Sequence, residues 1–283
     1  MATGAIGWKD VFVRAAKESA ADSIGLAAAG VSFYAFLAMV PLLGATVLIY
    51  GLAADVQTVS AHVAQIVSVL PGDAGKLIGD QLVSVVQSSS GKKGIGLAIA
   101  LAFALFGARN AAGGAINALN IAYDARECRS FVAVTLLALA MTMVAVLAAV
   151  FATLGIGAIS FMHLALPAAG PVTRALSGTL AYLLLALVGA TGAALLYRYG
   201  PSRAKTKWRW LTPGSILFAL AWVVLTLGFG FYVQRFGSYG ATYGSLSAVV
   251  VLLTWLYLSA YALLFGAELN SELDEHSAAR EGA

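Results

Sequence analysis

The chain has 283 residues, of which 60% are hydrophobic and 11% are charged. A typical soluble domain is about 25% charged, so this sequence has too few charged side chains to cover a water-facing globule of its size. The mean hydropathy of +0.87 and the net charge of +4 therefore favour a membrane protein whose basic residues report its topology. The single cysteine, Cys128, excludes an internal disulfide, and the sequence predicts no metal site.

Residues 1–23 are expected to form an amphipathic helix that lies on the cytoplasmic leaflet. Lys9, Lys17 and Glu18 lie away from the face formed by the more apolar residues. That face comprises Trp8, Val11, Phe12, Ala15, Ala16 and Ser19. An ordinary helix packed under the membrane domain is the alternative, and both interpretations stay open. The scattered charges do not fit a cleaved signal peptide, so we expect the first span to remain in the mature protein.

Six apolar stretches are long enough to cross a bilayer core, which needs roughly 20 residues. They cover about 24–52, 94–122, 131–162, 176–197, 213–233 and 243–267. The second is the weakest, because Arg109, Asn110, Asn117 and Asn120 interrupt it. The predicted fold class is an all-α integral membrane protein with six transmembrane helices, in which residues 24–271 form the membrane domain and residues 272–283 a cytoplasmic tail.

The connections between the spans differ in character. Residues 55–93 are long and polar, with apolar residues at helical spacing on both sides of Pro71 and Gly72. This segment is expected to form short amphipathic helices on the extracytoplasmic side. By contrast, the connection 198–209 is strongly basic.

The distribution of lysine and arginine predicts the orientation, because cytoplasmic loops carry an excess of both. With the N-terminus inside, eleven basic residues fall inside: Lys9, Arg14, Lys17, Arg126, Arg129, Arg198, Arg203, Lys205, Lys207, Arg209 and Arg280. Five fall outside: Lys76, Lys92, Lys93, Arg174 and Arg235. The sequence therefore predicts that both termini are cytoplasmic.

Motifs of soluble enzymes are missing from the sequence. It contains no Gly-x-x-x-x-Gly-Lys-Ser/Thr phosphate loop, no His-Glu-x-x-His pair and no nucleophile elbow. We therefore expect no ATPase activity and no cofactor, and the sequence nominates no catalytic residue.

Charged residues at bilayer depth are costly and normally have a partner. Arg109 lies midway along the second span, and Glu268 follows the sixth. Arg109 is either a site for an anionic headgroup or half of an ion pair that fixes helix packing. Since both spans run toward the cytoplasm in the predicted topology, we hypothesise that Arg109 and Glu268 meet.

Other polar and small residues are candidates for packing or for a path through the membrane. Asn110, Asn117 and Asn120 fall on roughly one helix face, which favours interhelical hydrogen bonds over a substrate path. Pro41 removes a backbone donor within the first span, so it marks a kink that serves packing or a hinge. Close-packing spacing also relates two glycines before the sixth span, Gly240 and Gly244, and the alternative for them is a flexible gate.

Three passages resemble one known family. They are residues 29–43, the Ala-Leu-Asn at 118–120 with Tyr123 after it, and residues 243–270 with their ending Gly-Ala-Glu-Leu-Asn. In these the chain resembles the YihY/BrkB family of bacterial inner-membrane proteins, historically mislabelled ribonuclease BN. The resemblance implies six spans in the cytoplasmic membrane, with links to serum resistance and to envelope lipid handling. It implies no catalytic residues, and the matching positions have no assigned role. These positions are Pro41, Asn120, Gly244, Trp255, Gly266, Glu268 and Asn270.

The leading functional hypothesis is a transporter or lipid translocator of the bacterial inner membrane. Its partners would be membrane lipids and an anionic lipid or other substrate, with no nucleic acid, and the glycine-rich faces permit a homo-oligomer. Candidate contacts to anionic lipid are Arg198, Arg203, Lys205, Lys207 and Arg209, although this cluster is first of all a topology signal. The alternative is a structural or assembly factor without a substrate. A membrane-bound ribonuclease is the least favoured, because no metal-binding carboxylates or histidine acid–base pair are recognisable.

Overall fold

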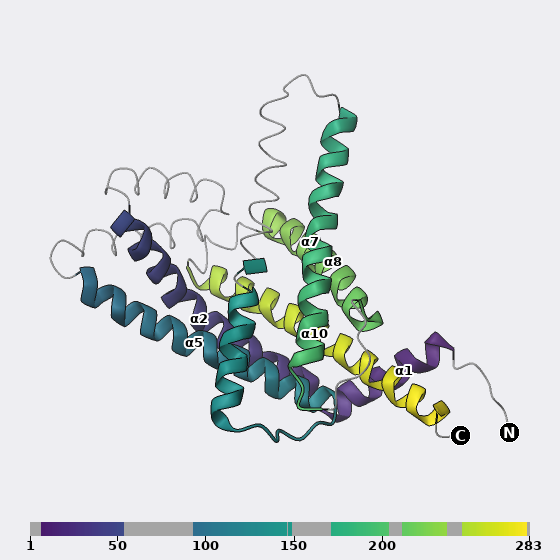
Figure 1. Ribbon diagram of the computed structural model, residues 1–283. Coiled ribbons are helices and arrows are strands. Elements are labelled where there is room, and N and C mark those ends of the chain that lie inside the picture. The colour runs from purple at the N-terminus through teal and green to yellow at the C-terminus, as the bar shows by residue number, and fades with distance from the viewer. Residues whose placement is uncertain are drawn as a thin grey trace.

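The computed structural model (Figure 1) describes residues 7–53, 93–145, 147–148, 171–203, 211–236 and 245–281, and all secondary structure within these ranges is helical. The helices labelled in Figure 1 are α1 (Trp8–Ala21), α2 (Ile24–Ala53), α5 (Lys93–Ala122), α7 (Pro171–Tyr199), α8 (Pro213–Phe236) and α10 (Ser245–Glu281). A further apolar helix covers Phe131–Ala145. The predicted all-α fold class is therefore confirmed for the described residues.

Three helical segments are long and apolar enough to cross a membrane: Gly178–Tyr199, Pro213–Tyr232 and Val249–Ser277. A fourth span results if α1 and residues 24–39 are counted as one bent element. Large apolar side chains such as Leu183 and Val224 point outward and are 60% and 67% exposed. Such surfaces are unfavourable in water and fit a lipid surrounding. The count of six spans stays a prediction, and the extracytoplasmic segment 55–93 lies outside the described residues apart from Lys93.

The chain bends by 68° between α1 and the first part of α2. The bend is made at Ser23, whose φ of 55° is in the left-handed region. At the end of α1 the Asp22 amide still donates to the Glu18 carbonyl at 2.8 Å, and the Leu26 amide then donates to the Ser23 carbonyl at 2.8 Å, inside α2. A left-handed residue after the last helical turn is a common way to end a helix.

Helix α1 packs beneath α10 through one face. Val11 and Ala15 are buried against Leu269, together with three half-buried neighbours on α8 and α10: Leu217, Phe265 and Leu273. Trp8 remains 62% exposed. Residues 8–21 therefore pack against the membrane domain through the face of Val11 and Ala15, as the alternative interpretation predicted. The placement of this helix on the cytoplasmic leaflet stays a prediction.

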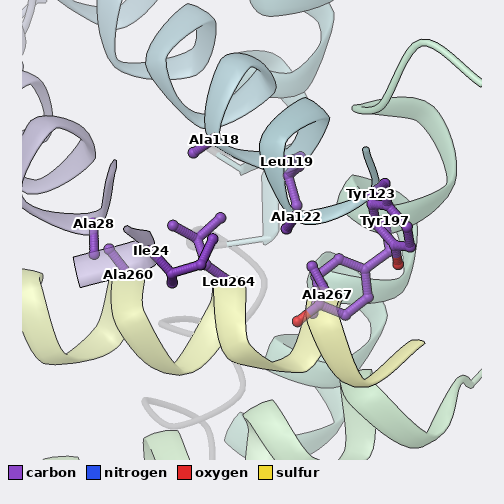
Figure 2. Close-up of a cluster of buried hydrophobic side chains, with 11 residues drawn as sticks. Ile24, Ala28, Ala118, Leu119, Ala122, Tyr123, Tyr197, Ala260, Leu264 and Ala267 are labelled. Atoms are coloured by element: carbon purple, nitrogen blue, oxygen red, sulfur yellow. The ribbon is translucent and has the colours of Figure 1, made fainter. Parts of the chain in front are cut away.

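Small residues allow the other helices to approach closely. The central cluster of buried side chains joins α2, α5, α7 and α10 (Figure 2), and alanine is its most frequent residue. Farther along α5, a Cβ added to Gly107 would lie 2.9 Å from the Ala38 Cα of α2. Such contacts between backbones are typical of packed helices in membranes.

The ends of α5, α7 and α10 meet α1 and the start of α8 at one end of the bundle. The contacts that show this are Arg129 to Gly200, Arg203 to Asp274 and Gly214 to Asn270, and for α1 the packing of Val11 and Ala15 against Leu269. The described segments that were predicted to share the cytoplasmic side therefore lie on a common face, which we call the junction face. Helix α10 continues to Glu281, well beyond the predicted end of the sixth span at residue 267.

Candidate functional site

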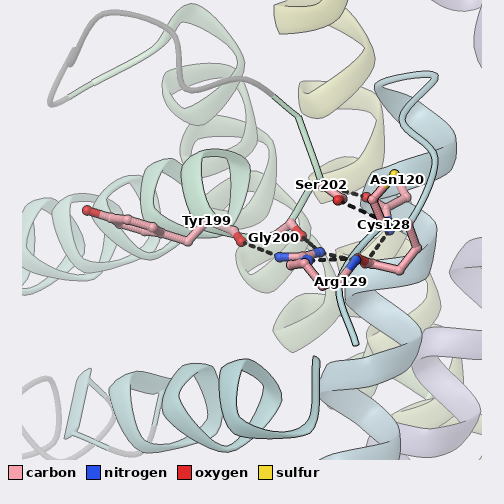
Figure 3. A network of polar contacts seen from close by, with 7 residues as sticks. Asn120, Cys128, Arg129, Tyr199, Gly200 and Ser202 are labelled. Atoms are coloured by element: carbon pink, nitrogen blue, oxygen red, sulfur yellow. Dashed lines mark hydrogen bonds and ion pairs between the residues drawn. The ribbon is translucent and has the colours of Figure 1, made fainter. Parts of the chain in front are cut away.

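Asn120 connects two loops at the junction face (Figure 3). It lies in the last turn of α5 and is only 6% exposed. Its amide nitrogen donates to Glu127 Oε2 at 2.9 Å, and its amide oxygen accepts from the Ser202 backbone N–H at 2.7 Å. The Cys128 N–H also donates to the Ser202 hydroxyl, at 3.3 Å. One asparagine therefore fixes the loop after α5 to the loop after α7.

Arg129 closes the C-terminal end of α7. Its guanidinium donates to the carbonyls of Tyr199 and Gly200 at 3.2 and 2.7 Å (Figure 3). The last carbonyls of a helix lack partners within the helix, and a cation there also suits the helix dipole. The same guanidinium forms an ion pair with Glu127 at 2.6 Å. Hydrogen bonding to Arg129 is the main reason that the pKa of Glu127 falls to about 2.

Arg203 links the loop after α7 to Tyr123 at the end of α5 and to Asp274 on α10. Its guanidinium carbon lies 3.8 Å from the ring centroid of Tyr123, and Nη1 donates to Asp274 Oδ2 at 2.8 Å. Burial raises the pKa of Tyr123, so the phenol stays neutral and offers its ring face to the cation. The side chain of Asp274 is 43% exposed, so this ion pair is accessible to water.

Asn270 holds the start of α8. Its amide oxygen accepts from the Gly214 N–H at 2.9 Å, and its amide nitrogen donates to the Thr212 hydroxyl at 2.9 Å. Thr212 and Ser215 also bond to each other in the pattern of a helix cap, with the Ser215 N–H donating to Thr212 Oγ1 at 3.2 Å. The first N–H groups of a helix need such partners. Asn270, which lies on α10, thus supplies one such partner to the start of α8.

Two glycines bring α8 and α10 into backbone contact. A Cβ at Gly214 would overlap the Gly266 carbonyl oxygen, and a Cβ at Gly266 would lie 2.6 Å from the Gly214 carbonyl oxygen. Tyr197 reaches the same point from α7 and donates its hydroxyl to the Leu263 carbonyl at 2.6 Å. Figure 2 shows this side chain directed toward α10. Three helices are therefore fixed together beside Glu268 and Asn270.

Glu268 is an ionisable side chain that is buried at the junction. It is 3% exposed, and its Oε1 has no hydrogen-bond partner among the described residues. Apart from burial itself, the charges that act on it are other carboxylates: Asp22, Asp124, Glu18 and Glu272. A buried carboxyl oxygen without a hydrogen bond and under the influence of other carboxylates is unusual, because burial of an unpaired charge is costly.

Arg109 is not the partner of Glu268, so the expected pairing is wrong. The Arg109 guanidinium donates to Asn110 Oδ1 at 3.1 Å and lies 4.8 Å from the Phe131 ring centroid. The reason is distance along α5. Arg109 precedes Asn120 by about three turns, or roughly 16 Å at 1.5 Å per residue, whereas Glu268 lies at the junction.

The other predicted site residues have different surroundings. Asn117 is exposed and Asn110 half-buried, so only Asn120 of the three asparagines is buried. Arg198 is half-buried, 5.7 Å from the Tyr199 ring centroid. Helix α2 runs through Pro41, whose side chain is outside the described residues. Also outside them are Lys205, Lys207, Arg209, Gly240 and Gly244.

The sequence did not identify several residues of the junction as candidate site residues. Glu127, Arg129, Ser202 and Asp274 lie in or beside short polar connections, where charge is expected in any membrane protein. Their partners are up to 82 residues away in the chain. The sequence shows that Arg129 follows the second predicted span by a few residues. It gives no sign that this side chain closes the C-terminal end of α7. Tyr197 was hidden within an apolar run.

The comparisons with known proteins agree with this helical membrane architecture. YfkH of Bacillus subtilis, which is named ribonuclease-like, is 30% identical over 195 residues, covering 66% of this chain and 69% of YfkH. A UPF0761 membrane protein of Tolumonas auensis is 36% identical over 104 residues, covering 37% of this chain and 34% of its own length. One of Xanthomonas campestris is 40% identical over 79 residues, covering 28% and 18%. This chain therefore matches about a third or less of the length of these two relatives.

No solved structure matches this chain. The family model described as Virulence factor BrkB matches residues 15–283, which include all of the junction except the first part of α1. Together with the similarity to YfkH, this match shows that the chain belongs to the virulence factor BrkB family of membrane proteins.

Proposed function

We propose that this protein is a transporter of the bacterial cytoplasmic membrane that moves an anionic lipid or another anionic substrate without an ATPase of its own. The observation that supports this most is Glu268, a buried carboxyl on a candidate membrane-spanning segment, whose Oε1 has no hydrogen-bond partner among the described residues. Ionisable residues at such positions are rare and commonly mark substrate or ion pathways.

The bend between α1 and α2 supports the same function. Transporter sites are often built where a helix is interrupted, because the interruption leaves polar backbone groups facing a site. Here the interruption at Ser23 adjoins Asp22, whose charge acts on Glu268. Irregular backbone within a membrane protein is tolerated where it is buried in protein or lines a cavity.

Basic residues at the junction face would attract the substrate. Each lysine or arginine close to an anionic surface contributes about 1 kcal/mol. Arg203 is held by Asp274 in a water-accessible ion pair, with 24% and 43% of the two side chains exposed. An anionic headgroup that reaches this face can therefore compete with Asp274 for Arg203.

A structural or assembly factor without a substrate is the alternative. It is favoured by the way Asn120, Arg129 and Asn270 are used within the protein, since each joins separate segments by hydrogen bonds. The two functions differ at Glu268. A scaffold needs this residue for folding, whereas a transporter needs its charge chemistry for activity. A ribonuclease has less support, since the described residues include no group of three or more His, Cys, Asp or Glu that could hold a metal.

Lipid scrambling in liposomes tests the proposal. Purified protein is reconstituted with a fluorescent anionic phospholipid, and a membrane-impermeant bleaching agent is added outside. The comparison is between wild type, Glu268→Gln and the control Glu275→Gln, which changes an exposed carboxylate on the same helix. Bleaching well past the outer-leaflet half, lost only in Glu268→Gln, is the expected result. Bleaching that stops at half in the wild type contradicts passive lipid translocation.

Orientation is tested with the natural cysteine. Cys128 is the only cysteine of the chain and is exposed in the loop after α5. If the junction face is cytoplasmic, an impermeant maleimide should label inverted membrane vesicles and leave intact cells unlabelled. Labelling of intact cells would reverse the proposed orientation.

A further inference from the structure

We propose that Glu268 is a proton-binding site, which carries a proton in the described conformation and exchanges it with water at the junction face. The use of this proton to drive transport rests on the proposed function, whereas the site itself follows from the geometry around Glu268.

The first feature that supports a proton site is the burial of Glu268. Glu268 is 3% exposed and its Oε1 accepts no hydrogen bond from a described residue. Isolated ionised carboxylates are so costly in apolar surroundings that such groups become neutral instead. The neighbouring buried residues along α10 are largely apolar: Leu264, Ala267 and Leu269.

A second feature is the sign of the charges that act on Glu268. Helix α1 contributes Glu18, the bend contributes Asp22, the end of α5 contributes Asp124, and α10 itself contributes Glu272. All four are carboxylates, and like charges oppose ionisation of the buried one. The two ion pairs formed among the described residues, Glu127–Arg129 and Arg203–Asp274, do not include any of these groups.

The same carboxylates differ in their exposure to water, which suggests a route. Glu18 and Asp124 are exposed, Asp22 is half-buried and Glu268 is buried. Burial, and then the charges of Asp124 and Glu18, raise the pKa of the Asp22 carboxyl. The proposed route for the proton runs from water at the surface past Asp22 to Glu268.

A proton fits this site better than a metal ion. Among the described residues no three His, Cys, Asp or Glu side chains are grouped to hold a metal, whereas a divalent cation needs several oxygen ligands. Binding forms one O–H bond on a Glu268 carboxyl oxygen, and release returns the proton to water. The neutral amide of Glu268→Gln resembles the protonated acid in shape and charge, so this variant is expected to fold.

Infrared spectroscopy tests the site directly. Full-length protein labelled with ¹³C-glutamate is reconstituted in lipid, and the carbonyl stretch of a protonated glutamic acid is recorded at neutral pH. We expect a band in wild type that is lost in Glu268→Gln and kept in the exposed control Glu275→Gln. Addition of sodium ions at constant pH should leave the band unchanged.

Three results would overturn the proposal. Absence of the band in wild type would show that Glu268 is ionised. A band that survives in Glu268→Gln would belong to another glutamate, and a band removed by sodium ions would make the ligand a cation. Because the spectrum needs no transport, failure of the proton site is distinguishable from failure of the proposed function. If the wild type scrambles lipid but shows no band of a protonated glutamic acid, the proposed function would stand and the proton site would be wrong.

Discussion

Replacing Gly266 by alanine should force α10 away from α8 and from Tyr197. The added Cβ would lie 2.5 Å from the Tyr197 hydroxyl oxygen and 2.6 Å from the Gly214 carbonyl oxygen. Overpacking of this kind costs about 1–3 kcal/mol, and weakening the hydrogen bond from Tyr197 to Leu263 adds about 1 kcal/mol. Alanine recovers about 1 kcal/mol through its higher helix propensity. The expected net loss is therefore about 1–3 kcal/mol of unfolding free energy.

The matched control is Gly192→Ala on α7. Gly192 is also half-buried within a helix, but a Cβ there meets nothing within 4 Å. It should therefore stabilise the protein by up to about 1 kcal/mol. Both variants would be unfolded with SDS in mixed micelles, and loss of helix followed by circular dichroism. Equal stability of Gly266→Ala and Gly192→Ala would refute the close approach of α8 and α10.

Three further substitutions probe the junction. Since the bond to Arg129 lowers the pKa of Glu127 from 4.5 to about 2, stability from this pair is present at neutral pH and is lost as the pH falls through that interval. Screening by solvent limits this stabilisation to about 1 kcal/mol. The acid-unfolding curve of Glu127→Gln should lack this loss of stability, and a curve identical to that of the wild type would contradict the prediction. Arg203→Met, which removes the ion pair and the contact with Tyr123, should lower the unfolding free energy by about 1–2 kcal/mol, and an unchanged thermal midpoint would contradict it. Ser23→Gly should raise the thermal midpoint, because a left-handed conformation costs a non-glycine residue about 1–2 kcal/mol, and a lowered midpoint would contradict the bend.

The helices were predictable because their signal is local. The apolar runs predicted spans over about 176–197 and 213–233, and the structure has α7 at Pro171–Tyr199 and α8 at Pro213–Phe236. The same dependence on a local apolar signal explains why the C-terminal end of α10 was not predicted. Residues 268–281 are polar, which ends a hydropathy signal, but they contain no proline or glycine to end a helix.

The site was predictable only in part. Asn120, Glu268 and Asn270 were named because polar residues beside apolar runs are conspicuous and because they fall in passages that resemble the family. Their partners were not predictable, since contacts such as Asn120 with Ser202 depend on how the loops meet in space. The pairing of Arg109 with Glu268 failed because topology fixes the direction of a span but leaves the depth of each residue open.

The central claim is that Glu268 serves transport and not merely folding. The most direct measurement determines, on the same reconstituted samples, the scrambling rate and the unfolding free energy of wild type, Glu268→Gln and Glu275→Gln. We expect that Glu268→Gln keeps the unfolding free energy of the wild type and loses scrambling, while Glu275→Gln keeps both. Loss of stability in Glu268→Gln without a specific loss of scrambling would contradict the claim and favour the structural role.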